Sequence, residues 1–357
     1  MSQRPPPEAW LKFCLVPGVG DGAIRKLLEH FGGIDAAAAA PTAVLRQVLP
    51  PRLAEALQGG PDPDLLLQTL EWLEKPQHFL LTLEDLDYPT LLREIPDPPP
   101  VLYGRGRREL LGRPALAIVG SRNATPQGMV NAEAFAEALS GAGLTIVSGL
   151  ALGIDTSAHR GGLRGEGSTI AVVGTGLDRV YPATNKALAH DIAGKGLLLS
   201  EFNLGSPSAA GHFPKRNRVI SGLCRGVLVA EAAPDSGSLI TARLGLEQGR
   251  EVFAIPGSIH SPQSRGCHQL IKQGAKLVET AIDVLEELAW PQMPTVAGAS
   301  ARAQDSLLAA MGHEPVSLDA LVTITGLTVE TLSAKLLALE LEGRIAQLPG
   351  GRYQQLP

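Results

Sequence analysis

The sequence ALAIVGSRNATPQGMVNAEAFAEALSGAGLTIVSGLALGID, residues 115–155, decides the fold. Two short apolar runs, 116–119 and 144–147, each end in a small polar turn, and the segment between them repeats apolar side chains every three or four residues. This pattern predicts two parallel strands joined by a helical crossover. We expect a ligand where the strands end, beside the helix N-termini.

The same alternation continues along the chain. Further strands are predicted at 168–174, 196–201, 226–232, 251–256 and near 275–278, with helices at 154–163, 184–193, 216–223 and 239–248. The strands are almost continuously apolar, which indicates burial on both faces. The fold class is therefore α/β, an open, doubly wound, mostly parallel sheet.

Regions of different character flank this sheet. Residues 1–75 are predicted to form a helical N-terminal domain, in which Val16-Pro17-Gly18-Val19-Gly20 precedes a basic helix and looks like a helix-hairpin-helix element. A turn between two packed helices is the preferred interpretation of that motif. The sheet domain is placed at 76–289, and its proline-rich segment 88–106 is predicted to be an extended strap that leads into the sheet.

The C-terminal part is predicted to be a separate module. Residues 290–304 are rich in proline, glycine, alanine and serine, as in a linker, and 305–357 read as three short helices and a hairpin, the pattern of a winged helix. From residue 302 onward there are more acidic than basic side chains. This balance favours contact with a protein over binding to duplex DNA.

Composition limits the class of protein. The chain has 357 residues, 44% of them hydrophobic and 19% charged, with a net charge of −5, so any site for a polyanion must be a local patch. The three cysteines form no C-x-x-C pair, and no apolar run approaches the length of a membrane span. We expect a soluble, cytoplasmic protein.

The predicted strands end in turns that suit phosphate groups. These turns are Gly120-Ser121-Arg122, Ser148-Gly149, Gly174-Thr175-Gly176 and Ser236-Gly237-Ser238. Glycine allows close approach of the backbone, and hydroxyls add donors. The first turn lacks G-x-G-x-x-G, a Walker motif is absent, and no metal-ligand spacing occurs, so we expect neither a nucleotide cofactor nor a metal.

A basic segment follows. Lys215, Arg216 and Arg218, with Asn217 among them, are predicted at the start of a helix, where positive charge opposes the helix dipole unless an anion lies nearby. Arg122, Arg179 and Lys186 are expected to complete a positive pocket. The segment therefore predicts an anion site.

Two parts of the sequence carry residues suited to acid-base chemistry. Asp155 and His159 lie four residues apart on one predicted helix, but no nucleophile motif accompanies them, so capping and packing are preferred. Glu231 ends a buried strand, where a catalytic base and a carboxylate that accepts from the turn 236–238 are both open.

A series of motifs resembles the DNA-processing protein A (DprA/Smf) family. The motifs are GSR at 120–122, SGLALGID at 148–155, GTGLDRVYP at 174–182, LSE at 199–201, FPKRNRVISG at 213–222, EAAPDSGSLIT at 231–241 and GCHQLIKQGA at 266–275, after a lead-in at 88–106. The resemblance implies an extended Rossmann-like domain between a helical domain and a winged helix. It also implies a homodimer through the Rossmann-like domain.

The function implied by this resemblance is binding of single-stranded DNA and loading of the RecA recombinase in natural transformation and recombination, without catalysis. The implied DNA-binding residues are Ser121, Arg122, Ser148, Gly149, Gly174, Gly176, Lys186, Lys215, Arg216, Asn217 and Arg218. The alternative is a nucleotide-processing hydrolase of a related Rossmann-like fold, with Glu231 as its base.

Overall fold

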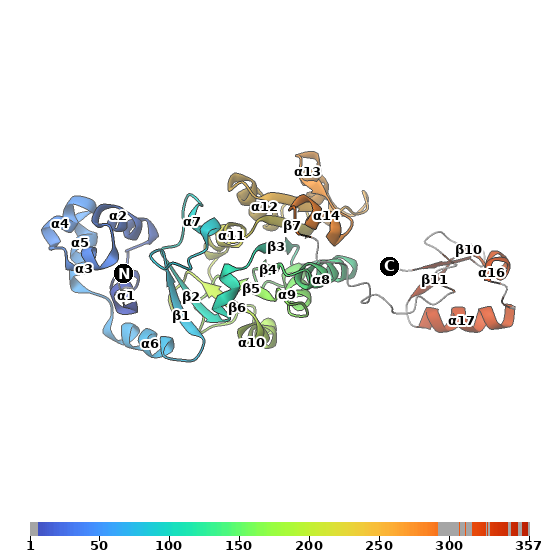
Figure 1. Cartoon of the computed structure of the whole chain (residues 1–357), viewed down its shortest axis with the longest axis horizontal. Helices are drawn as coiled ribbons and strands as arrows, with labels where there is room; N and C mark the ends of the chain where they lie inside the picture. The colour runs from blue at the N-terminus through green and yellow to red at the C-terminus, as the bar shows by residue number, and fades with distance from the viewer. Residues whose placement is uncertain are drawn as a thin grey trace. The chain divides into compact units, whose positions relative to one another are not determined.

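The computed structural model describes residues 6–291, 307, 311, 316–325, 327, 329–341, 344–348 and 352–355. They belong to two compact units, Met1–Pro291 and Gln292–Pro357. The first contains the N-terminal helices and a nine-stranded sheet, and the second contains a three-stranded sheet with its own helices (Figure 1).

The N-terminal helices pack beside one edge of the large sheet (Figure 1). They are α1 (Pro7–Cys14), α2 (Asp21–Phe31), α3 (Ile34–Ala39), α4 (Thr42–Val48), α5 (Pro51–Gly59) and α6 (Pro63–Leu73). In the turn before α2, Gly18 has a φ of +86°, which favours glycine. Trp10 and Leu27 share one buried cluster with Tyr103 and Leu198 of the sheet. The helices and the sheet edge therefore have a common core.

The large sheet has the strand order β1-β2-β6-β5-β4-β3-β7-β8-β9. Its strands are β1 (His78–Thr82), β2 (Val101–Gly106), β3 (Ala115–Gly120), β4 (Thr145–Ser148), β5 (Thr169–Val172), β6 (Leu197–Ser200), β7 (Gly226–Glu231), β8 (Glu251–Ala254) and β9 (Lys276–Leu277). From β6 to β9 the neighbouring strands are parallel, and β1 and β2 extend this sheet with antiparallel pairings. The predicted fold class is confirmed.

Helices cover the sheet and connect its strands. They are α7 (Thr90–Arg93), α8 (Pro126–Gly141), α9 (Ile154–Gly162), α10 (Lys186–Lys195), α11 (His212–Gly222), α12 (Ser238–Glu247), α13 (Arg265–Lys272) and α14 (Ala281–Glu287). Short 3-10 turns lie at Arg108–Gly112, Ala183–Asn185 and Pro262–Ser264. The next strand in sequence after β3 is β4, which pairs with one side of β3. The later strand β7 pairs with the other side, so the strand order reverses at β3. A crevice is expected at such a reversal.

One predicted helix start was wrong, and the difference affects the charge argument. The helix expected from residue 216 begins at His212, because proline is tolerated in the first turn and Pro214 therefore does not exclude an earlier start. The basic residues then begin at the fourth position of α11. The dipole effect falls off beyond the first turn, so opposition to the dipole is weaker than the sequence suggested.

The second unit has the arrangement of a winged helix. It contains β10 (Val316–Ser317), α16 (Leu318–Thr325), α17 (Val329–Leu341), β11 (Ile345–Leu348) and β12 (Arg352–Gln355), with the antiparallel order β10-β12-β11. Leu321, Leu332, Leu336 and Ile345 form its own buried cluster with neighbouring apolar side chains. Of the helix expected at 305–311, only 307 and 311 are described, both helical, and most of the linker expected at 290–304 lies outside the described residues.

Candidate functional site

A cleft of about 750 Å³ lies at the carboxyl ends of β3 and β7, between α11 and α12. It is lined by Val119, Gly120, Ser121, Arg122, Asn123, Ala151, Asp155, Ala210, Phe213, Pro214, Arg216, Asn217, Ile220, Ala233, Asp235, Ser236, Gly237, Ser238, Ile240, Thr241 and Gln263. This is the reversal point of the strand order, where open α/β sheets bind ligands. The position expected for a ligand therefore contains a cleft.

The Gly-Ser-Arg turn forms one wall. The N–H of Ser121 donates to the carbonyl of Glu231 at 2.7 Å, which ties the turn to the end of β7. The hydroxyl of Ser121 accepts from the N–H of Asn123 at 3.1 Å. A Cβ on Gly120 would lie 2.5 Å from Ile154, so this position needs glycine. The turn is thus held by its backbone, and Arg122 remains exposed at its tip.

Arg122 and Phe213 lie together across the cleft. The guanidinium carbon of Arg122 is 5.2 Å from the centre of the Phe213 ring, within the range of a cation–π contact. The Phe213 ring lies 5.9 Å from that of Tyr181, which is 49% exposed. A cation beside accessible aromatic rings can pair with a phosphate while a base stacks nearby.

Arg216 forms the floor of the same cleft. Its Nη1 donates to the carbonyl of Val172 at 3.1 Å, and only 4% of the residue is exposed. A Cβ on Gly149 would lie 1.4 Å from this Nη1, so glycine makes room for the guanidinium. Burial lowers the pKa of Arg216, and Asp155 opposes that shift. Its Nε has no hydrogen-bond partner among the described residues.

Lys215 and Arg218 lie outside the cleft lining and are held by carboxylates of the protein. Lys215 Nζ is 2.8 Å from Asp21 Oδ2 and 3.4 Å from Glu201 Oε2. Arg218 donates to Glu201 and to the carbonyl of Asp97. Burial raises the pKa of Glu201 to about 7, against the effect of these two cations. Part of the negative charge expected near the basic segment is therefore supplied by carboxylates of the protein itself.

The other strand-end residues support the backbone. Ser148 is fully buried and donates to the carbonyl of Ile118 at 2.7 Å, and the N–H of Gly149 donates to Asp155. Gly176 donates its N–H to Ser206 at 3.1 Å, and a Cβ there would lie 2.6 Å from the carbonyl of Asn203.

Gly174 and Lys186 also lie outside the lining of the cleft. The carbonyl of Gly174 is 3.0 Å from His212 Nδ1, in the first turn of α11. Lys186 is exposed as the first residue of α10. Of the predicted DNA-binding residues, the cleft brings together Ser121, Arg122, Arg216 and Asn217.

Asp155 and His159 both fix the loop that follows β4. Asp155 accepts from the N–H groups of Gly149 and Ala151, at 3.1 and 3.3 Å. His159 Nε2 accepts from the N–H of Leu150 at 3.2 Å, so Nδ1 carries the proton and donates to Thr169 Oγ1 at 2.8 Å. Burial lowers the pKa of His159 to about 3. The two side chains therefore bind the backbone and Thr169 and do not form an acid-base pair with each other.

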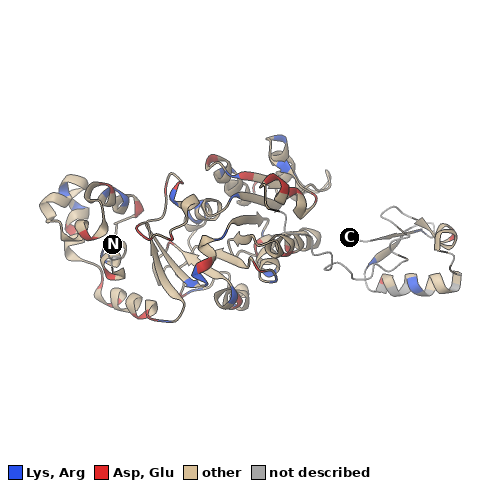
Figure 2. Ribbon diagram, viewed as in Figure 1, with Lys and Arg blue, Asp and Glu red and all other residues tan. Residues whose placement is uncertain are grey.

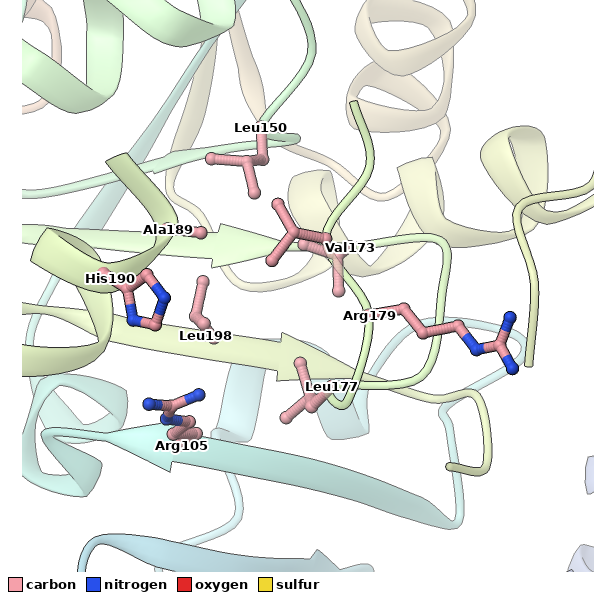
Figure 3. Close-up of a pocket in the computed structure, with 9 residues that line it drawn as sticks. Arg105, Leu150, Val173, Leu177, Arg179, Ala189, His190 and Leu198 are labelled. Carbon is pink, nitrogen blue, oxygen red and sulfur yellow. The ribbon is translucent and has the colours of Figure 1, made fainter. Parts of the chain in front are cut away.

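Leu150 itself has a φ of +58° and lines a small cavity behind this loop. Figure 3 shows Leu150 and Val173 above His190 of α10 and Arg105 of β2. The volume is about 20 Å³, room for about one water molecule. This cavity is too small for a nucleotide, so the large cleft is the candidate site.

The contacts of Glu231 fit neither a catalytic base nor a carboxylate that accepts hydrogen bonds from the turn 236–238. Its carboxylate accepts from the N–H of Thr125 at 2.9 Å and from the hydroxyl of Thr125 at 2.5 Å, at the start of α8. The predicted contact with the turn 236–238 is wrong, since Ser236 and Ser238 bond to each other. Glu231 is thus engaged in holding a helix N-terminus.

Some residues of the lining are absent from the set of DNA-binding residues predicted from the sequence. Phe213 lies in the motif FPKRNRVISG and the turn 236–238 suits phosphate, so both carried a signal that could have found them. Asp235 and Gln263 carried no recognisable signal. Basic and acidic segments are intermixed around the sheet (Figure 2), so charge alone does not mark the cleft.

The described residues contain no group of three or more His, Cys, Asp or Glu that could hold a metal ion. None of the helices described is long and apolar enough to cross a membrane.

The fold and the cleft define a Rossmann-like protein with a ligand cleft at the reversal of its strand order and an attached winged helix. The family model of the DNA recombination-mediator protein A matches residues 79–289, and that of the DprA winged helix domain matches 291–351. The chain belongs to this DprA/Smf family.

Three relatives illustrate the similarity. Protein Smf of Synechocystis is 39% identical, covering 97% of this chain and 98% of the relative. The X-ray structure of DprA from Streptococcus pneumoniae is 41% identical with a TM-score of 0.71, covering 78% of this chain and 97% of that one. A DprA structure from Helicobacter pylori, which concerns that protein's single-stranded DNA binding mode, is 32% identical with a TM-score of 0.53, covering 59% and 95%.

Proposed function

We propose that the chain binds single-stranded DNA in the cleft between α11 and α12, as a recombination mediator rather than an enzyme. The observation that carries this proposal is the placement of exposed Arg122 against Phe213, at the mouth of glycine- and serine-rich turns. Family membership supports it, as does the DNA binding of the H. pylori relative. A single strand exposes its bases for stacking, which a duplex does not.

Each predicted DNA-binding residue then has a role in this proposal. Ser121, Arg122, Arg216 and Asn217 contact the strand in the cleft. Lys186 follows the segment of Tyr181, whose ring lies near Phe213, and extends the path of the strand beyond the cleft. Ser148, Gly149, Gly174, Gly176, Lys215 and Arg218 hold the loops and α11 in place.

Titration of the protein with labelled oligonucleotides tests this function. Fluorescence anisotropy at physiological salt is expected to show tighter binding of a single strand than of a duplex of the same sequence and length. Equal affinities for the two forms would contradict binding through the cleft, because a duplex cannot place its bases beside Phe213.

We further propose a larger role, with RecA as partner in recombination and natural transformation, and a homodimer through the Rossmann-like domain; membership of a recombination-mediator family supports the link to recombination. The cytoplasm is the proposed location. If the protein loads RecA, its addition should accelerate RecA filament formation on a single strand already covered by a single-strand binding protein. The same acceleration must be lost with a variant that does not bind DNA.

The hydrolase alternative is disfavoured by the contacts of Glu231. Its carboxylate accepts two hydrogen bonds from Thr125, whereas a general base needs to reach a substrate proton. Incubation with nucleoside monophosphates is expected to release no base. Release that disappears in Glu231→Gln would restore the alternative.

The winged helix is proposed to contact a protein partner. Its presumed recognition helix α17 carries a single basic residue, Lys335, and the module as a whole is more acidic than basic. Phosphate contacts supply most of the affinity for duplex DNA, so such a module is poorly suited to it. Removing residues 292–357 is expected to leave single-strand affinity unchanged within about twofold.

A further inference from the structure

The N-terminal turn of α12 forms another part of the cleft lining. Ser236, Gly237, Ser238 and Thr241 all line the cleft there. The N-cap is Gly237, the first turn of the helix contains no acidic residue, and the N–H of Ser238 donates to Ser236 Oγ at 3.4 Å. The N–H groups of Leu239 and Ile240 donate to the carbonyls of Ser236 and Gly237, so the hydroxyls of this turn are the groups left to bind a ligand. The dipole of the helix start attracts anions, and no carboxylate of its first turn neutralises it.

A second observation points to a ligand at the same place. Thr241 is only 2% exposed and lines the cleft, yet its hydroxyl makes no hydrogen bond to any residue that the structure describes. Buried polar groups are normally paired, so a donor left in this position suits a partner that enters from the cleft.

The serine hydroxyls add a further donor. Ser236 Oγ and Ser238 Oγ are 2.7 Å apart, and one donates to the other. Each hydroxyl has one proton, so this contact uses one and leaves the second free to donate into the cleft. The serine pair therefore presents one free hydroxyl donor beside the helix N-terminus.

The charges around the turn are compatible with an anion. Arg122 and Arg216 line the same cleft. Of the lining carboxylates, Asp155 accepts from two N–H groups of its own loop, and Asp235 is exposed to solvent. Glu231, which precedes the turn, faces Thr125. A ligand with several acceptor oxygens and negative charge fits this set of donors, as a phosphate group does.

We propose that Ser236, Ser238, Thr241 and the first turn of α12 form a second phosphate subsite, separate from Arg122 and built from neutral donors. This inference rests on the proposed binding of DNA in the cleft. The phosphate is one of the bound strand, so a strand passing Arg122 is held at a second point of the cleft. A free nucleotide has the same chemistry and is distinguished by the experiment below.

The variant Thr241→Val tests the subsite, because it removes the hydroxyl and keeps the branched shape. A hydrogen bond to a charged group is lost, so affinity for a single strand is expected to fall roughly tenfold. The slope of log K against log salt should stay unchanged, because that slope follows the cations that replace counterions. Thr241→Ser keeps the hydroxyl and should bind like the parent. Thr90→Val, at an exposed hydroxyl at the start of α7, is the matched control.

The phosphate contacted is located with oligonucleotides in which one phosphate at a time is a neutral methylphosphonate. For the parent, replacement at the contacted position should weaken binding, and Thr241→Val should abolish that particular loss. In Arg122→Ala, the position at which a methylphosphonate no longer reduces affinity should be a different one along the oligonucleotide. Competition with inorganic phosphate and a nucleoside monophosphate forms the second arm. Displacement of the strand by millimolar monophosphate would assign the subsite to free nucleotides.

The inference is overturned if Thr241→Val binds the single strand with the parent's affinity at every salt concentration, and if each methylphosphonate reduces the affinity of both proteins by the same factor. The proposed function would survive that result, because the parent would still bind the strand. If the parent does not bind single-stranded DNA at all, the proposed function itself fails. Thermal unfolding of each variant identifies a loss of affinity that comes from misfolding.

Discussion

Lys215 Nζ lies 2.8 Å from Asp21 Oδ2, which joins α11 beside the cleft to α2 of the N-terminal helices. Glu201 contacts both Lys215 and Arg218, and Arg218 also approaches Asp97. The basic segment that the sequence presents as one anion site is therefore divided. One face of α11 lines the cleft, and the other is anchored by carboxylates from three segments of the chain.

Glu201→Ala is expected to reduce the free energy of unfolding by about 3 kcal/mol, because Arg218 is left buried without its main counter-charge. The loss should be at the low end for a buried pair, since Asp97 and Asp21 still contact Arg218. Urea unfolding measures it, with exposed Glu247→Ala on α12 as control. A loss no larger than that of the control would refute the anchoring role.

Gly149→Ala should destabilise the protein by about 1–3 kcal/mol, because its Cβ would lie 1.4 Å from Arg216 Nη1 and must displace the guanidinium. DNA affinity should fall with it. Gly194→Ala on α10 is the matched control, since a Cβ there meets nothing within 4 Å. That substitution should stabilise by about 0.5–1 kcal/mol. Equal stability of the two variants would show that Arg216 does not occupy the position described.

Stability should fall as the pH is lowered below 6.5, because the folded protein holds His159 neutral and lowers its pKa to about 3. The unfolded chain takes up the proton first, so the contribution of His159 is present above pH 6.5 and is lost at about 1.4 kcal/mol per pH unit toward pH 3. Urea unfolding at pH 7 and pH 5 measures this slope. His159→Gln, which cannot titrate, should make it shallower, and an unchanged slope would assign it to other groups.

Phe213→Ala should weaken single-strand binding by about 1–3 kcal/mol if a base stacks on the ring. Phe213→Leu keeps an apolar side chain and separates stacking from simple packing against Arg122 and Tyr181. We expect leucine to restore folding stability but not affinity. Full affinity in the leucine variant would mean that the ring does not stack on a base.

The sheet was predictable because its strands are short, apolar runs separated by helix-length segments, from Leu116 onward. The start of α11 was not, because no local signal marks His212 as its first residue, and a first helical turn accepts Pro214. The division of the basic segment was also hidden. It depends on Asp21 and Asp97, which are distant in sequence and reach Arg218 only in the folded chain. Local pattern gives no information on such long-range ion pairs.

The most direct test of the proposed function is the salt dependence of single-strand binding by the parent and by Arg122→Ala. Exposed Arg243→Ala on α12, outside the cleft lining, is the matched control for loss of one positive charge. We predict that Arg122→Ala weakens binding and reduces the slope of log K against log salt by about 0.7, as for one lost phosphate contact, while the control leaves both unchanged. If Arg122→Ala binds with the parent's affinity and slope at every salt concentration, DNA does not bind in this cleft.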